Sequence, residues 1–224
     1  GSEMCIRDRE RPMTRRQLKD AALRARALSA QGMTKPEIFD QILSDVQKPL
    51  MAARIVASIP SPEGMRRYRR MNIVLGTLMM LLAILIGLAK AAQVSAKLGS
   101  ELDPGTSAVV AILLGLLFFG VFASISLSIF KYKYGGYIGA VVLLLLMIPQ
   151  SLSATMQTLA DPSSGALPLL ELLLGVLLPI LLIWLTVKLR NNVFVKARLF
   201  GAPRKKPDGS FEFSTAFELR KEKG

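Results

Sequence analysis

The sequence predicts an all-α fold: a four-transmembrane-helix integral membrane protein with a small N-terminal cytoplasmic three-helix module. Three observations predict it: four long apolar stretches, Lys and Arg gathered near alternate ends of those stretches, and three short helical patterns before the first of them. Of the 224 residues 51% are hydrophobic, yet the formal net charge is +13. The positive charge must therefore lie between the apolar stretches, where it orients a membrane protein.

The four apolar stretches satisfy the length of about 20 residues that crosses a hydrocarbon core of about 30 Å. They are apolar on every face, which core helices of a soluble protein are not. Turn-forming sequences separate them: GSELDPGTS, KYKYGG and ADPSSGA. Pro149 and Pro179 lie inside spans, where we expect local kinks. The predicted spans are 72–92, 108–130, 137–159 and 168–187, within a bundle at 63–188.

Small residues recur every four positions along the first two spans. This spacing lets transmembrane helices approach closely, so we expect these residues to pack the four helices together, and dimerisation through one stripe stays open. The stripes are Ala83/Gly87/Ala91, Ala111/Gly115 and Gly120/Ser124/Ser128.

Charges near the span ends predict the orientation. Ten basic residues lie on one side and only Lys90 and Lys97 on the other, so the positive-inside rule places both termini in the cytoplasm of a prokaryotic inner membrane. Every Tyr and the sole Trp fall on the side of the ten, where amphipathic rings settle at an interface. Lys196 and Arg198 are two of the ten basic residues. The remaining eight, with the aromatic residues, are the predicted interface anchors, which would meet the lipid bilayer and its anionic headgroups. They are Arg66, Arg67, Tyr68, Arg69, Arg70, Lys131, Tyr132, Lys133, Tyr134, Tyr137, Trp184, Lys188 and Arg190.

Residues 14–62 are predicted to form the cytoplasmic helical module. Thr14 with Gln17, and Thr34 with Glu37, have the spacing of capping boxes, and Gly32 suits a left-handed helix stop. Pro49 would start a third helix and Pro60 would end it, after which a helix would run straight into the first span. The predicted core residues are Leu18, Ala22, Leu28, Ile38, Ile42, Ile55 and Val56.

The sequence AQGMTKPEI, residues 30–38, resembles the turn of helix-turn-helix proteins, which implies DNA binding. The helix after the turn would present Glu37, Asp40 and Asp45 against a single Lys35, and phosphate would repel it. We therefore expect the motif to serve packing, and we do not expect nucleic acid as a partner.

The two ends of the chain are predicted to add little to the fold. Residues 1–13 contain MCIRDR, which looks like a translated sequencing adapter, so they are predicted to be adapter-derived or disordered. Residues 189–224 are predicted to be a basic, solvated cytoplasmic tail; Pro-Asp-Gly followed by Phe211-Glu212-Phe213 leaves a short hairpin open.

Chemical motifs are sparse. The chain has no His and its only Cys is Cys5, and no phosphate loop, nucleophile elbow or metal-ligand pattern occurs. We expect no catalytic residue, metal or cofactor. Polar residues inside membrane spans are energetically costly in lipid, so their presence indicates a role. The only candidate site that the sequence offers is therefore a cluster of such residues in the outer leaflet. Its members are Lys90, Gln93, Gln150, Ser153, Gln157 and Glu171, with Lys90 and Glu171 at matching depth as an expected ion pair.

These features favour a non-enzymatic polytopic membrane protein, a scaffold or accessory subunit whose helical module docks a protein partner or caps the bundle. An alternative is a small transporter or channel subunit that forms a pore as a homo-oligomer. A membrane-tethered helix-turn-helix transcription regulator comes third.

Overall fold

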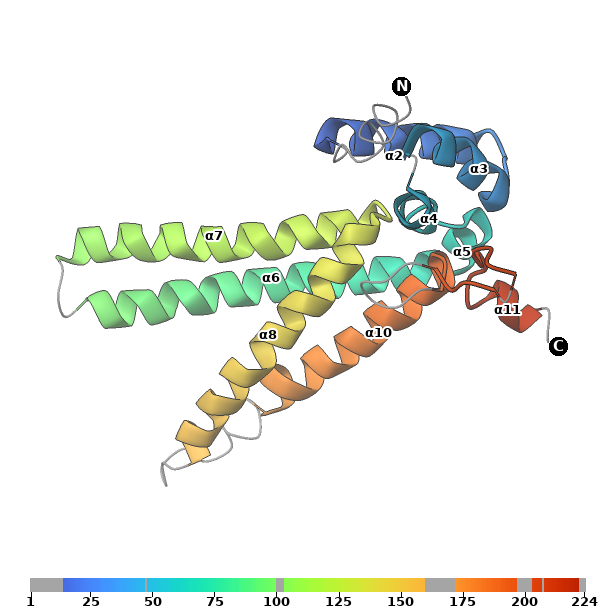
Figure 1. Cartoon of the computed structure of the whole chain (residues 1–224). Coiled ribbons are helices and arrows are strands. Elements are labelled where there is room, and N and C mark those ends of the chain that lie inside the picture. Colours follow the sequence, from blue (N-terminus) through green and yellow to red (C-terminus); the bar gives the residue numbers. More distant parts are fainter. Residues whose placement is uncertain are drawn as a thin grey trace, which may run out of the picture. The chain divides into compact units, whose positions relative to one another are not determined.

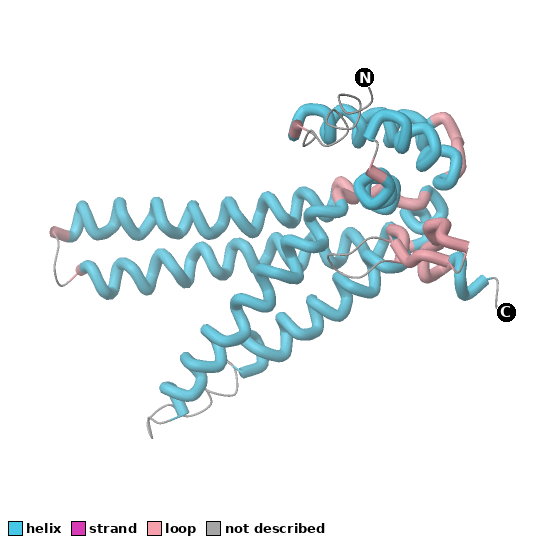
Figure 2. The backbone as a smooth tube through the Cα atoms, in the orientation of Figure 1, coloured by secondary structure: helices cyan, strands magenta, loops and turns pink. Residues whose placement is uncertain are grey.

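The computed structural model describes residues 14–46, 48–99, 103–159, 172–196, 203–206 and 208–221. Within these ranges the chain is helical (Figure 2), and its β pairing consists of two isolated antiparallel bridges. The all-α class is confirmed. In chain order the elements (Figure 1) are α2 Arg15–Ala30, α3 Lys35–Val46, α4 Pro49–Ala57, α5 Pro62–Arg67, α6 Arg69–Leu98, α7 Pro104–Phe130, α8 Tyr134–Leu159, the π-helical η2 Leu173–Leu177, α10 Leu178–Val193 and α11 Glu218–Lys221.

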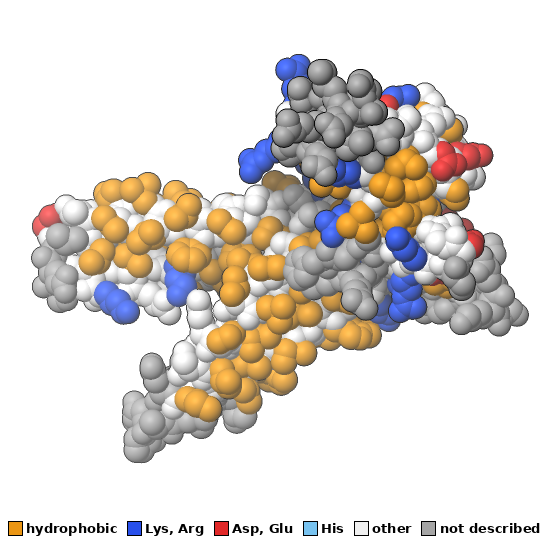
Figure 3. Space-filling view, in the orientation of Figure 1, with side chains coloured by type: hydrophobic (Ala, Val, Ile, Leu, Met, Phe, Trp, Pro, Cys, Tyr) orange, Lys and Arg blue, Asp and Glu red, His pale blue; other side chains and the backbone are white. Residues whose placement is uncertain are grey.

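The chain divides into two compact units. The terminal unit contains Gly1–Ser61 together with Phe194–Gly224, and the long-helix unit is Pro62–Val193. The long-helix unit holds four helices that are long and apolar enough to cross a membrane, in agreement with the sequence. Figure 3 shows hydrophobic side chains along the visible face of these helices.

Local capping chemistry sets the ends of the helices of the terminal unit. The Thr14–Gln17 capping box is present, with Gln17 N donating to Thr14 Oγ1 (3.3 Å) and Thr14 N to Gln17 Oε1 (2.9 Å). Thr34 N donates to Glu37 Oε2 (2.8 Å), and this bond lowers the pKa of the Glu37 carboxyl. Gly32 has a φ of +87°, the left-handed conformation that ends α2. Pro49 opens α4 as predicted.

The core of the terminal unit lies between α2, α3 and α4. Its buried side chains are small or β-branched: Ala21, Ala25, Ile38, Ile42, Val46, Ala52, Val56 and Ile59. Ile38, Ile42 and Val56 confirm the sequence prediction. Leu28 and Ile55 are partly buried and pack against this core, in agreement with the prediction. On α2 the buried residues are Ala21 and Ala25, which the sequence analysis missed, while Leu18 and Ala22 are only half-buried. Alanine on this face allows α2 to approach its neighbours closely.

The C-terminal segment packs on these helices. Phe213 lies against the core, and Phe39 of α3 has its ring centroid 5.4 Å from that of Phe213 and 5.5 Å from that of Phe211. Bridges join Val195 to Thr215 and Lys205 to Phe211. The prediction of a solvated tail is therefore wrong for the described part of this segment, because its phenylalanines bury apolar area that a free tail would leave in water.

In the long-helix unit, α5 and α6 are separate helices. The sequence predicted one helix running straight into the first span, but Tyr68 has φ −100° and ψ +13° and interrupts it. The helices α6 and α7 then run side by side as a hairpin, and α8 with α10 form a second pair (Figure 1). Asp103 caps α7 by accepting a hydrogen bond from Thr106 N (3.0 Å).

Glycines set how closely the long helices approach. A Cβ atom at Gly115 would lie 2.8 Å from Gly87 O, and one at Gly87 would lie 3.0 Å from Gly115 O. The stripes of α6 and of Ala111/Gly115 thus pack helices together, as expected. Gly120 has open space around it, whereas a Cβ atom at Gly136 of α8 would lie 2.7 Å from Ser128 Cβ. The third set of small residues therefore packs against a neighbouring helix at Ser128 and not at Gly120.

The fourth span changes helix type ahead of its proline. Leu178 N donates to Leu173 O, five residues back, in the π-helical segment η2. Pro179 follows directly, and a wider turn relieves the clash between its ring and a carbonyl of the preceding turn. The local distortion expected at Pro179 takes this form. Pro149 lies inside α8, which continues through it.

Candidate functional site

The outer polar cluster lies partly outside the described residues. Glu171 and the side chain of Gln157 lie outside them, so the ion pair of Lys90 with Glu171 stays a prediction. Lys90 Nζ donates to Gln93 Oε1 (3.1 Å) on its own helix and lies 5.9 Å from the centroid of the Phe118 ring on α7. On α8, Ser153 Oγ donates to Gln150 O (2.9 Å). The described part on α6 therefore bonds within its own helix and contacts α7, and the part on α8 bonds within its own helix.

A second set of polar residues, which sequence reasoning missed, lies buried where α6, α7 and α8 meet. Asn72 is 1% exposed, and its Nδ2 donates to Ile129 O (3.0 Å) in the last turn of α7. The Tyr137 hydroxyl donates to Asn72 Oδ1, and Ser126 Oγ donates to Gly76 O (2.7 Å). We call Asn72, Ser126 and Tyr137 the buried polar cluster. It joins α6 to backbone carbonyls of α7 and to α8 by hydrogen bonds, and it gives these buried polar side chains partners.

Further hydrogen bonds join α10 to the same region. Arg190, 2% exposed, donates from Nη2 to Tyr134 Oη (2.5 Å), and its guanidinium lies 5.2 Å from the Tyr134 ring centroid. Tyr68 Oη donates to Asn192 Oδ1 (3.3 Å). The sequence analysis missed Asn192 because an Asn at the end of a predicted span is typical of a turn. The amide at the first position of the predicted span 72–92 was the available signal for Asn72.

The predicted interface anchors fall into two groups. Trp184 is 56% exposed with Lys188 Nζ 4.6 Å from its ring centroid, an arrangement suited to an interface. The other predicted cations apart from Arg190 are exposed as well. Tyr137 and Arg190 are buried, so these two stabilise contacts between helices. Tyr132 Oη donates to Met65 O (3.3 Å), and burial raises the pKa of Tyr132.

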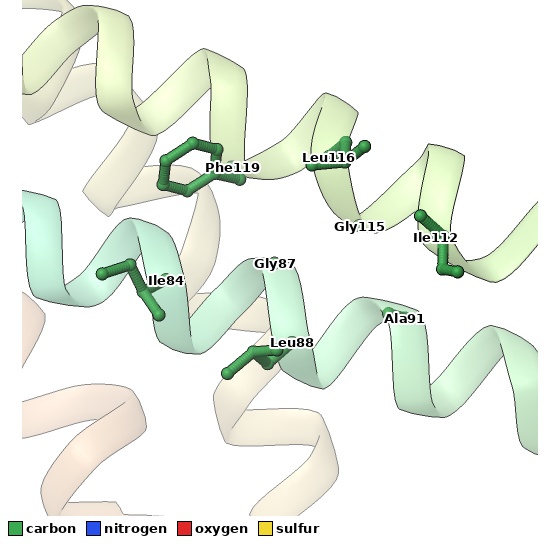
Figure 4. Close-up of a pocket in the computed structure, with 8 residues that line it drawn as sticks. All are labelled: Ile84, Gly87, Leu88, Ala91, Ile112, Gly115, Leu116 and Phe119. Carbon is green, nitrogen blue, oxygen red and sulfur yellow. The ribbon is translucent and has the colours of Figure 1, made fainter.

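An apolar groove of about 330 Å³ runs between α6 and α7 (Figure 4). Its floor is made by Gly87, Ala91 and Gly115, which put almost no side chain between the helices. Its walls are apolar: Ile84, Leu88, Ile112, Leu116 and Phe119. A groove without a polar side chain can hold an aliphatic group and cannot orient a polar one.

Acidic and thiol side chains do not gather as a metal site within the described ranges, where no three of them come together. The expectation of no metal and no cofactor stays a prediction. The candidate sites are therefore the outer polar cluster, the buried polar cluster and the apolar groove. Comparison of the chain with family models, with curated proteins and with solved structures finds no match.

Proposed function

We propose that this chain is a prokaryotic inner-membrane protein that crosses the bilayer four times, keeps both termini in the cytoplasm, and uses its terminal unit to dock a protein partner as a non-enzymatic scaffold or accessory subunit. Four helices of sufficient length and apolar character support the crossings. Their exposed side chains are mainly large and apolar, as in Leu88 (65% exposed) and Leu113 (62%), which lipid would cover.

One observation carries the proposal: the terminal unit is built from both ends of the chain. Phe213 packs on the core of α2, α3 and α4, and the bridge between Val195 and Thr215 holds the two parts of the C-terminal segment together. Two ends that fold together must lie on one side of a membrane, which requires an even number of crossings. The ten-to-two distribution of basic residues then favours the cytoplasmic side.

The surface of the terminal unit favours a protein partner over DNA. On α3, Ile38, Ile42 and Val46 face the core, while Glu37 and Asp40 are exposed. Arg24 of α2 donates from Nη1 to both carboxylate oxygens of Asp45 (2.7 and 3.0 Å), so this arginine is engaged by the helix that would read a groove. The exposed acidic side chains of α3 would be repelled by the phosphates of DNA, and the neighbouring Arg24 is already paired with Asp45.

The topology is tested first. In a Cys5→Ser background, single cysteines at Ser100 and Ser164 should react with a membrane-impermeant maleimide added outside intact cells. Cysteines at Ser44 and Ser210, both exposed in the terminal unit, should react only after the cells are opened. Labelling in the opposite pattern, or at both sets, would contradict the proposed orientation.

Docking is tested by photo-crosslinking in cells. Leu23 (53% exposed) and Leu50 (47% exposed) are large apolar residues on the surface of the terminal unit. A photoreactive amino acid at either position should yield the same heterologous adduct, and the same residue at the exposed polar Ser44 serves as control. An adduct of twice the chain mass would favour the alternative of a pore-forming homo-oligomer. No discrete adduct at either position would contradict docking.

A further inference from the structure

Within the long-helix unit, the pair α6–α7 and the helix α8 are in contact at one end and apart at the other. At the contact end the Tyr137 hydroxyl of α8 donates to Asn72 of α6, and a Cβ atom at Gly136 of α8 would lie 2.7 Å from Ser128 Cβ of α7. Figure 1 shows α8 diverging from α6 and α7 toward the end at which α6 stops and α7 starts. We call that half of the unit the outer half.

The surfaces that touch at the contact end become exposed in the outer half. Positions seven residues apart lie on about the same side of a helix. On α7, Val121 is seven residues from Ser128 and 44% exposed, and Phe118, one turn further, is 39% exposed. On α8, Gln150 is fourteen residues from Gly136 and is also exposed. The α7 and α8 surfaces that pack together at one end are therefore uncovered at the other.

Polar residues of the outer polar cluster lie on the matching side of α6. Gln93 is 21 residues from Asn72, three times the spacing of seven, and Lys90 lies one turn before it. Lys97, seven residues beyond Lys90, adds a second cation, and Figure 3 shows basic side chains along the edge of α6 nearer to α8. We call these surfaces of the outer half the diverging faces; they consist of Lys90 and Gln93 of α6, Phe118 and Val121 of α7, and Gln150 of α8.

Lys90 has no carboxylate partner among the described residues. Its Nζ donates to Gln93 Oε1 (3.1 Å) and lies 5.9 Å from the centroid of the Phe118 ring, so both of these contacts are with neutral groups. An ammonium has three N–H donors, and this hydrogen bond uses one of them. Asp103, the described carboxylate at this end of the unit, accepts from Thr106 N as the cap of α7. A cation within a span is costly without a partner, so this arrangement favours an anionic ligand.

The levels of the polar groups match the order of groups in a phospholipid. Asn72 and Tyr137 are hydrogen-bonded and so lie at one level. Lys90 is 18 residues beyond Asn72 and Gln150 is 13 beyond Tyr137, which places them about 27 Å and about 20 Å along their helices from that level. A hydrocarbon core of about 30 Å would then end just beyond Lys90, where lipid phosphates lie. The ester carbonyls of a phospholipid lie deeper than its phosphate, as Gln150 lies deeper than Lys90. The Gln150 backbone carbonyl accepts from Ser153 Oγ (2.9 Å), which leaves the side-chain amide available.

We propose that the diverging faces bind an anionic phospholipid, with its phosphate at Lys90, an ester carbonyl at the side-chain amide of Gln150, and an acyl chain along Phe118 and Val121. A small soluble anion would leave these exposed apolar side chains uncovered, whereas an acyl chain covers them. The second cation, Lys97, favours a lipid of net negative charge over a zwitterionic one. The inference rests on the proposed crossing of a membrane, and it does not depend on the direction in which the chain faces or on a protein partner.

The test is photolabelling of the full chain in phosphatidylcholine nanodiscs that contain a phospholipid with a diazirine on an acyl chain. The probe carries either a phosphatidylglycerol or a phosphatidylcholine headgroup, and the adducts are mapped by mass spectrometry. The phosphatidylglycerol probe should label Phe118 and Val121 about tenfold more, which is the factor expected from one hydrogen bond to a charged group. Leu116, 59% exposed and on about the opposite side of α7 from Phe118, should be labelled equally by both probes.

Variants identify the groups that select the lipid. Lys90→Met should remove most of the preference for phosphatidylglycerol, and Lys90→Arg, which keeps the charge, should retain it. Gln150→Leu should lower labelling of Phe118 by both probes several-fold, because both lipids have ester carbonyls. Lys131→Met removes the same charge from an exposed lysine at the other end of α7, and it serves as the control that should keep the preference.

Equal labelling of Phe118 and Val121 by the two probes, or a preference that survives in Lys90→Met, would overturn the lipid site. A preference that appears only in Glu171→Gln would also overturn it, because Glu171 would then be the partner of Lys90. Excess inorganic phosphate should leave the labelling unchanged, and a loss of labelling would show that Lys90 binds soluble phosphate instead of lipid.

The proposed function is read separately from this site. A chain that does not enter nanodiscs would contradict the membrane crossing and the lipid site together. Selective labelling in nanodiscs, combined with no heterologous adduct in cells, would support the lipid site and contradict the docking of a protein partner. Selective labelling combined with cysteine accessibility opposite to that expected would support the lipid site and contradict the proposed orientation.

Discussion

Both units of this protein bury apolar side chains, but they differ in the polar side chains that they bury and in the apolar ones that they expose. In the terminal unit the fully buried residues are aliphatic, such as Ala25, Ile38 and Ile42, and the ion pair of Arg24 with Asp45 lies at the surface. In the long-helix unit Asn72, Ser126, Thr186 and Arg190 are buried, while large apolar side chains such as Leu88 (65%) and Met156 (64%) are exposed. The proposed membrane location accounts for this difference, because water would surround the terminal unit and lipid would surround the long helices.

This contrast shows what holds each unit together. Water drives apolar groups of the terminal unit inward at about 25 cal/mol for each Å². In the membrane that we propose, lipid would offer no such drive between helices, so close backbone approach and hydrogen bonds would hold the long helices together. The approach of Gly87 to Gly115 and the bonds of Asn72 are contacts of that kind. Substitutions should therefore affect the units through different mechanisms.

The largest effect is expected from a cavity in the terminal unit. Ile42 is fully buried, so Ile42→Ala should destabilise this unit by about 2–5 kcal/mol, through lost apolar burial and the space left behind. The measurement is urea unfolding of the full chain in detergent, followed by limited proteolysis of α2–α4. Leu23→Ala, at a 53% exposed position, is the matched control and should change little. Equal loss of both units would contradict their separation.

Crowding the contact between α6 and α7 should cause the second-largest loss of stability. In Gly115→Leu the new Cβ would lie 2.8 Å from Gly87 O, a backbone atom that cannot move aside alone. We expect a loss of about 1–3 kcal/mol or more. The matched control is Gly120→Leu on the same helix, where nothing lies within 4 Å of the new Cβ. Thermal unfolding in detergent would measure both, and equal melting temperatures would show that the close approach does not stabilise the hairpin.

Removal of a buried hydrogen bond should lower the free energy of unfolding by less than the crowding of the α6–α7 contact does. Asn72→Leu removes the hydrogen bond from the Tyr137 hydroxyl to Asn72 and the one from Asn72 to Ile129 O, for which we expect a loss of about 1 kcal/mol of stability. The double variant Asn72→Leu with Tyr137→Phe should cost less than the sum of the two single changes. Ser153→Ala, which removes an exposed hydroxyl bonded within its own helix, is the control. Additive costs would mean that the two side chains act separately.

The smallest effect is expected at the outer polar cluster. If Lys90 and Glu171 form an ion pair near the membrane surface, Lys90→Ala and Glu171→Gln should each cost less than about 1 kcal/mol. Their double variant should cost less than the sum, measured as thermal stability in detergent. Strict additivity would show that the groups do not meet. The bond to Gln93 and the contact with Phe118 would then be the partners of Lys90.

Local chemistry in the sequence was enough to predict the elements. The capping box at Thr14, the glycine stop at Gly32 and the proline start at Pro49 act within one helical turn, and each is confirmed at its residue. The four apolar helices follow from a run of side chains, which needs no knowledge of neighbours. The break at Tyr68 was missed because no Gly or Pro marks it.

Only the tertiary structure decided which residues act together. Asn72 and Tyr137 are 65 positions apart in the chain, and Ser61 and Glu218 are 157 apart. Hydropathy describes each segment by itself, so it assigned the C-terminal phenylalanines to a tail and Arg190 to a lipid interface. Their partners come from distant helices, and a contact between distant segments depends on how the helices pack. That packing, unlike a cap or a span, is not written in any single stretch of the sequence.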